Sequence, residues 1–196
     1  MKIYTKAGDQ GTTTILGGTQ VSKADTRLDV YGSIDELNAQ IGVVIEHCTD
    51  QTDREVLSKI QEELFRVGTI FATDWSKFDA SLNVISEEAV RRLEKNIDRI
   101  ASALPASKGF VMPRGSVLCA FAHVARTVCR RAERLAVAHS ENVATEYRPP
   151  MDSINEIYQP QGWKKPKTNP ERFFVRGIQY LNRLSDYLFV LARKNA

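Results

Sequence analysis

Residues 5–14, with the sequence TKAGDQGTTT, combine side chains and backbone features that suit phosphate binding. Gly8 and Gly11 stand three apart and allow a tight turn with exposed backbone N–H groups, and such a concavity binds anions. Lys6 adds a positive charge, and the threonines add hydroxyl groups. The segment is not a Walker A loop, because no G-K-[ST] ends it. These residues favour a polyphosphate site, and a merely polar arm is the alternative.

A second group of charged residues lies in the sequence HVARTVCRRAER. On a helix, Arg126, Arg130, Glu133 and Arg134 share one face. Arg131 points about 100° away from Arg130. Guanidinium groups bind phosphate and carboxylate in a bidentate manner. Small apolar residues occupy much of the remaining helix surface, so we expect the arginines to be partly buried and to need partners. A solvated charged face is the alternative.

Three further parts of the sequence contain residues that could take part in binding or catalysis. Asp35 lies in the sequence SIDEL, where simple helix capping is the first interpretation. Residues 110–116, FVMPRGS, form a predicted Pro-Gly turn that leads into a helix whose N-terminus could face an anion. Phe110 is a core residue on the alternative reading. Cys119 and His123 are four residues apart and would lie on one face of a helix. Two potential ligands are too few for a zinc site, so we interpret both as packing residues and expect no metal site.

Five segments with helical spacing of apolar residues must position these groups. Capping signals place the helix starts at Ser33, Thr52, Ser86, about Ser116, and Asn169 before Pro170. Before them, residues 1–32 form a loop-rich arm, with a short strand expected at residues 2–5. The fourth helix should end near Ala138, and a proline-rich irregular insert should follow over about residues 139–168. The sequence therefore predicts an all-α five-helix bundle formed by one domain over residues 1–196.

Composition limits the possible classes of protein. The 196 residues suffice for roughly one domain with a core of its own. A net charge of +3 is too small to indicate nucleic acid or an anionic membrane. Three cysteines without a C-x-x-C spacing favour a reducing compartment. With no apolar signal segment and no run approaching about 20 apolar residues, a soluble cytoplasmic protein is expected.

Four motifs occur in a fixed order along the chain, and together they are more specific for a family than any one alone. They are TKAGDQGTTTILGG, SKADTRLDVYGSIDELNAQIG, HVARTVCRRAER and YLNRLSDYLFVLAR. Together they resemble the ATP:cob(I)alamin adenosyltransferases of the propanediol-utilisation (PduO) type, over about residues 1–138 and 176–193. The resemblance implies a five-helix bundle and a homotrimer with active sites between subunits. It also implies a reaction in which cob(I)alamin attacks the 5′-carbon of ATP and triphosphate leaves, which yields adenosylcobalamin.

The resemblance also implies which residues contact ATP. Those in the N-terminal loop are Thr5, Lys6, Gly8, Thr13 and Thr14, with Lys23 in its continuation. Those on the last two long helices are Arg130, Glu133 and Asn182. Lys6, Arg130 and Mg²⁺ bound with ATP would stabilise the leaving triphosphate, and no metal ligand of the protein itself is implied.

Three more residues match positions beside the corrinoid. Asp35 and Arg126 match a pair that bridges subunits, and Phe110 matches an aromatic residue that crowds the lower face of the corrin. The cobalt is itself the nucleophile, so no protein base is required and the protein has to place cobalt in line with the 5′-carbon. On this basis Asp35, Phe110, Arg126 and Arg130 are the residues expected to serve catalysis.

Two features depart from the family pattern. The turn before the fourth helix usually reads close to LPGG, whereas here Arg114 replaces a glycine. This arginine could alter the corrinoid fit or contact a propionamide or a phosphate. The link between the last two helices is also longer than usual, and it is a lid over the corrinoid, a surface addition or partly disordered chain.

Other functions stay open at this point. One is a non-enzymatic helical module that binds RNA or acidic partners through the face of residues 126–134. The small net charge and the lack of interleaved aromatic residues argue against it. Another is a chaperone that delivers adenosylcobalamin to a dependent enzyme. A reductase that supplies Co(I) is a further expected partner, whereas nucleic acid and membranes are not.

Overall fold

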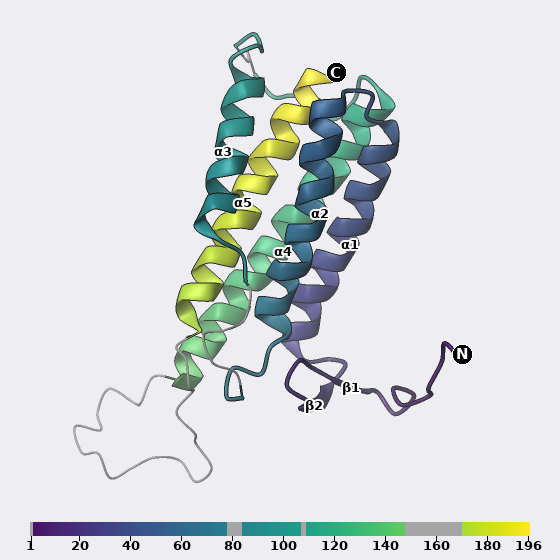
Figure 1. Ribbon diagram of the computed structural model, residues 1–196, viewed down its shortest axis with the longest axis vertical. Helices are drawn as coiled ribbons and strands as arrows, with labels where there is room; N and C mark the ends of the chain where they lie inside the picture. The colour runs from purple at the N-terminus through teal and green to yellow at the C-terminus, as the bar shows by residue number, and fades with distance from the viewer. Residues whose placement is uncertain (1, 78–83, 107–108, 148–169) are drawn as a thin grey trace, which may run out of the picture.

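The computed structural model describes residues 2–77, 84–106, 109–147 and 170–196. In order they form β1 (Thr12–Thr14), β2 (Gln20–Ser22), α1 (Thr26–His47), α2 (Gln51–Ala72), α3 (Glu87–Ala101), α4 (Val117–Tyr147) and α5 (Glu171–Lys194). The helices run side by side as a bundle, with α3 packed on α5 (Figure 1). The predicted all-α five-helix bundle is confirmed. In the described part of the chain, no helix has the length and apolar character that crossing a membrane requires.

The first helix begins earlier than predicted. Its cap is Asp25, whose carboxylate accepts a hydrogen bond from the backbone N–H of Arg27 at 3.0 Å. Ser33 is therefore not a cap but a buried residue inside α1. The apolar face already starts at the fully buried Val30, so the upstream cap prevails and helix replaces the last part of the expected arm at residues 26–32.

The second and third helices begin close to the predicted positions. α2 is capped by Asp50, which accepts from the backbone N–H of Asp53 at 3.1 Å, so Thr52 lies in the first turn. α3 is capped by Ser86 as predicted, with the backbone N–H of Ala89 donating to the Ser86 hydroxyl at 3.2 Å. Short polar side chains that accept from the first turn fix both starts.

The fourth helix is longer than predicted. α4 continues past Ala138 to Tyr147, and Val143 still packs against the core there. The expected insert therefore cannot begin at residue 139. Residues 148–169, which hold the rest of the predicted insert and the predicted cap Asn169, lie outside the described residues.

The N-terminal arm is a hairpin joined to the end of α2. β1 and β2 pair antiparallel, with Thr13 opposite Val21. Leu16 donates its backbone N–H to the carbonyl of Ala72 and accepts from Asp74, both at 2.9 Å. The strand expected at residues 2–5 is wrong, because the described strands lie further along the arm.

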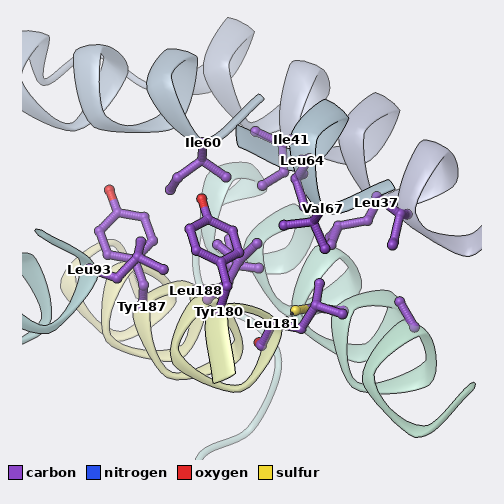
Figure 2. Packing of buried hydrophobic residues seen from close by; sticks show 14 of the residues in the cluster. Leu37, Ile41, Ile60, Leu64, Val67, Leu93, Tyr180, Leu181, Tyr187 and Leu188 are labelled. Carbon is purple, nitrogen blue, oxygen red and sulfur yellow. Dashed lines mark hydrogen bonds between the residues drawn. The ribbon is translucent and has the colours of Figure 1, made fainter. Parts of the chain in front are cut away.

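The core is apolar, with two tyrosines buried inside it. Figure 2 shows Leu37 and Ile41 of α1 and Ile60, Leu64 and Val67 of α2 facing Tyr180, Leu181, Tyr187 and Leu188 of α5. Burial raises the pKa of the Tyr180 hydroxyl above its usual value, so this group keeps its proton. It donates to Glu63 at 2.8 Å. Glu63 is only 2% exposed and also pairs with Arg92 of α3. This contact joins α2, α3 and α5.

A second buried carboxylate joins the other ends of these helices. Asp53 of α2 is fully buried and receives Arg99 of α3 and Lys194 of α5, each at 2.7 Å. Lys194 also contacts Asp50 at 2.7 Å. Two ion-paired acids of α2 therefore hold α3 and α5 in place along its length.

We expect Glu63→Gln to lower the free energy of unfolding by about 2 kcal/mol, because it leaves the partly solvated Arg92 without its countercharge. The matched control is Glu62→Gln. Glu62 is exposed and its ion pair with Lys59 lies on the surface, so its loss should cost less than about 0.5 kcal/mol. Urea unfolding of both variants measures the difference, and equal losses would contradict the importance of the buried pair.

Candidate active site

A cavity of about 350 Å³ opens between α4 and α5. Its lining residues are Arg130, Glu133, Arg134, Val137 and Asn182. The shared helical face expected for the two arginines and Glu133 is therefore present. Asn182, which comes from α5, could not be placed beside them by spacing alone. The structure thus brings together the three residues of the long helices that the family resemblance assigns to ATP.

Hydrogen bonds fix the floor of this cavity. The Asn182 side-chain N–H donates to Glu133 Oε1 at 2.9 Å. The side-chain oxygen of Asn182, Oδ1, accepts a hydrogen bond from the Arg183 guanidinium at 2.6 Å. The same guanidinium also donates to the Glu94 carboxylate at 2.9 Å. Within the residues that the structure describes, no carboxylate pairs with the Arg130 guanidinium. This exposed cation therefore stands beside an oriented carboxylate and amide, ready to bind an anion.

The neighbouring arginines have different surroundings. Arg131 points to α1 and pairs with Glu36, as its 100° offset from Arg130 predicts. Arg126 lies one turn before Arg130, outside the cavity, and its Nε donates to His123 Nδ1 at 3.4 Å. Burial, followed by the charge of Arg126, lowers the pKa of His123. The neutral ring can therefore accept this bond and keep the side chain of Arg126 in position.

Asp35 lies on another face of the bundle. It is not in a first turn, so the capping interpretation is wrong: α1 begins nine residues earlier, at Thr26. Asp35 instead lines a cavity of about 340 Å³ between α1 and α2. Phe65, with 67% of its surface exposed, lines the same cavity. No hydrogen bond or ion pair joins Asp35 to Arg126 among the described residues of one chain.

Sequence reasoning missed Phe65. The apolar face of its helix includes Leu64, and a residue one position further lies about 100° away from that face. A large aromatic residue off the buried stripe was the available signal for an exposed apolar surface.

The N-terminal arm adopts consecutive tight turns over the residues assigned to phosphate binding. The backbone N–H of Asp9 donates to the backbone carbonyl of Lys6, and the backbone N–H of Gly11 donates to that of Gly8, both at 3.2 Å. Lys6 has a φ of 62°, a left-handed conformation that is uncommon for this residue type. A Cβ atom at position 8 would lie 2.9 Å from Lys23 Nζ, so glycine allows this ammonium group to approach the backbone.

The arm is nevertheless separate from the cavity between α4 and α5. Thr5, Lys6 and Thr14 are exposed, and Thr13 is half-buried against the paired strand. No arm residue is among those that line the cavity beside Arg130. The two groups of residues assigned to ATP therefore do not meet within one chain.

The turn before α4 carries an exposed aromatic residue. Phe110 is fully exposed, so the alternative of a core position is wrong for a single chain. Cys119 and His123 are buried, in agreement with the packing interpretation. In the ranges that the structure describes, no group of three or more His, Cys, Asp or Glu side chains could hold a metal ion.

A larger cavity, of about 510 Å³, lies beside the hairpin and has a different lining. Asp25, Arg27, Trp75 and His139 contribute to it, and none of the residues assigned to ATP or corrinoid does. Asp25 and Arg27 already pair with each other there at 2.7 Å. This cavity is therefore not the candidate site.

Comparisons with known proteins agree with the motifs. The family model described as cobalamin adenosyltransferase matches residues 3–195. A corrinoid adenosyltransferase of Mycobacterium tuberculosis is 37% identical over 194 residues, which cover 98% of this chain and 87% of the relative. A corrinoid adenosyltransferase of Bacillus subtilis is 36% identical over 197 residues, with 98% and 86% covered.

Solved structures show the same architecture. A phenylalanine-to-alanine variant of the PduO-type ATP:corrinoid adenosyltransferase from Lactobacillus reuteri, complexed with cobalamin and ATP, superimposes with a TM-score of 0.78. It is 32% identical to this chain, and the match covers 98% of this chain and 92% of that one. Since the family model, the relatives and the fold all agree over nearly the full length, this five-helix chain belongs to the cobalamin adenosyltransferase family.

Proposed function

We propose that the chain transfers the 5′-deoxyadenosyl group of ATP to the cobalt of a reduced corrinoid such as cob(I)alamin. The observation that carries this proposal is the Arg130 guanidinium, which pairs with no carboxylate of the described residues and lies beside the oriented pair of Glu133 and Asn182, in a chain that belongs to this family. The family match favours this enzyme over a non-enzymatic module that binds RNA or acidic proteins. The proposal therefore does not include nucleic acid as a binding partner.

The reaction requires charge stabilisation and alignment. The cobalt of the reduced corrinoid forms a bond to C5′ of ATP, and the bond from C5′ to the triphosphate oxygen breaks. Negative charge develops on the leaving triphosphate, where Arg130 and Lys6 would stabilise it. Because cobalt is the nucleophile, the protein has to hold the two reacting atoms in line and supplies no base.

ATP is held by two sets of residues in this proposal. The arm supplies Thr5, Lys6, Gly8, Thr13, Thr14 and Lys23, and the long helices supply Arg130, Glu133 and Asn182. The sets are separate within one chain, so two copies would complete each site. A surface that meets a different surface of the next copy closes into a ring when the rotation between copies closes, and a rotation of one third of a turn would give the proposed homotrimer.

Mg²⁺ enters this proposal with ATP. Proteins commonly hold Mg²⁺ through substrate phosphates and one or two carboxylates. Among the described residues, Glu133 supplies a carboxylate to the lining of the cavity beside Arg130, so the residues fit an ion that the phosphates bring with them. When bound, the ion would add positive charge to the triphosphate.

The corrinoid would lie where Asp35 of one copy meets Arg126 of the next. In support, Asp35 lines a largely apolar cavity on one face, and His123 holds Arg126 on another. Phe110 would crowd the lower side of the corrin, because an exposed ring can displace the lower axial ligand of the cobalt.

The reaction would take place in the cytoplasm. The three cysteines are buried and free, which suits a reducing compartment. A reductase would supply Co(I), and an adenosylcobalamin-dependent enzyme would take the product.

The decisive assay mixes the protein with ATP, Mg²⁺ and chemically reduced cob(I)alamin, and follows the absorbance change to adenosylcobalamin. We expect conversion well above a protein-free control. No conversion would overturn the proposal, and salt-sensitive RNA binding in the same preparation would favour the helical module.

Arg130→Ala should lower kcat/KM for ATP by about a hundredfold or more, since it removes a charge-assisted contact to the leaving triphosphate. Arg131→Ala is the matched control, because Arg131 pairs with Glu36 on the surface and should change the rate little. Steady-state kinetics on both folded variants provides the comparison. Equal losses would argue against a special role of Arg130.

Asp35 and Arg126 should be energetically coupled across the boundary between copies. A double-mutant cycle with Asp35→Ala and Arg126→Ala should give a coupling of about 1–3 kcal/mol in corrinoid binding or in trimer dissociation. Within one chain the two side chains do not touch, so coupling requires assembly. Strictly additive effects would refute the pair.

Phe110→Ala should slow the reaction strongly when it starts from cob(II)alamin with a reductant, and much less from pre-reduced cob(I)alamin. Loss of the ring lets the lower ligand stay on cobalt, which keeps Co(II) hard to reduce. The spectrum of bound cob(II)alamin should lose its four-coordinate features. Val175→Ala, which truncates an exposed apolar residue of α5, is the control. Retention of those features and of the normal rate would remove Phe110 from the site.

A further inference from the structure

The turn that carries Phe110 has a firmly held backbone. Arg114 donates its N–H to the carbonyl of Met112 at 2.8 Å, and its own carbonyl accepts from the Cys119 thiol at 3.3 Å. Ser116 caps α4 by accepting from the backbone N–H of Cys119 at 3.0 Å. The same hydroxyl donates to the carbonyl of Asn195 at 2.5 Å, which ties the turn to the end of α5.

Gly115 allows this contact with α5. Its φ is 140°, in the range that favours glycine. A Cβ atom at position 115 would lie 2.7 Å from the Cα of Ala196, so a side chain there would displace the backbone. The turn is therefore fixed before any ligand binds.

The side chain of Arg114 contrasts with this fixed backbone. It is exposed, and within the described ranges its guanidinium has no hydrogen-bonding or ionic partner. The apolar side chains around it in sequence are also exposed: Phe110 fully, Met112 by 59% and Val117 by 56%. A cation without a partner among the described residues, in a segment whose apolar side chains are also exposed, fits a ligand that has a broad apolar face and one fixed negative charge.

A complete corrinoid has this chemistry on its lower side. The amide side chains of the ring are neutral, whereas the nucleotide tail that supplies the lower axial base contains a phosphodiester. When Phe110 displaces that base, the tail must lie on the same side of the ring as the turn. A corrinoid without the tail, such as cobinamide, presents no anion there.

We propose that Arg114 binds the phosphodiester of the nucleotide tail and makes the enzyme selective for complete corrinoids over those that lack the tail. This inference rests on the proposed function, including the position of Phe110 below the corrin. The triphosphate of ATP is the other phosphate in the reaction, and it is common to both corrinoid substrates. A comparison of the two substrates therefore separates the two sources of phosphate.

The test measures kcat/KM for cob(I)alamin and for cob(I)inamide with wild type, Arg114→Ala and Arg114→Lys. We expect Arg114→Ala to lower the value for cob(I)alamin about three- to tenfold, mainly through KM, and to leave cob(I)inamide unchanged. Arg114→Lys should keep most of the preference because it retains the charge. Raised salt should weaken the preference of wild type. Arg91→Ala, which removes an exposed arginine paired with Glu87 on α3, is the charge control.

Two other outcomes overturn the proposal, and a third overturns the proposed function instead. Equal losses with both corrinoids would assign Arg114 to the triphosphate or to the fold, and unfolding midpoints would separate these two. No change with either corrinoid would mean that Arg114 makes no contact. If wild type converts neither corrinoid, the proposed function fails. Equilibrium binding of cob(II)alamin and cob(II)inamide then still tests Arg114, because a tail contact must weaken only the first in Arg114→Ala.

Discussion

The close packing of α4 on α5 is the contact on which the remaining structure depends. Fully buried small residues such as Ala125, Ala132 and Cys129 let the two helices approach. Burial raises the pKa of the Cys129 thiol, which stays protonated and donates to the carbonyl of Leu181 at 3.1 Å. One residue further on α5, Asn182 lines the cavity beside Arg130. The packed side of this helix pair therefore sets the geometry of its open side.

Local chemistry in the sequence predicted much of the fold. The Ser86 cap and the shared face of Arg130 and Glu133 follow from side-chain type and from 3.6-residue periodicity. The start of α1 was misplaced because Asp25 and Ser33 both precede helical patterns, and only packing decides between them. The cavity beside Asp35 was not predictable, since it arises where two helices meet. The ATP and corrinoid roles came from family resemblance, because spacing alone does not specify a ligand.

Under the proposed function, the ATP site is divided between the arm and the bundle, which links activity to assembly. The arm is fixed to its own chain at Leu16, next to the end of α2, so its position follows that of the bundle. The cavity beside Arg130 belongs to a different face. Under the proposed function, a single chain holds each half of the ATP site in a defined geometry but cannot bring them together. Agents that separate the copies would then abolish turnover without unfolding the helices.

The hydrogen bond between the side chains of Glu133 and Asn182 bears on how much the connection between α4 and α5 can vary in length. It joins residues 49 positions apart, and the Cys129–Leu181 contact beside it spans 52. The register of α4 against α5 is therefore set by contacts inside the helix pair and does not depend on the length of the chain that connects them. In general, each doubling of a loop's length costs only about 0.6 kcal/mol in closure entropy. Evolution or an engineer can thus lengthen this connection, or insert a whole domain into it, while Glu133 and Asn182 keep their places.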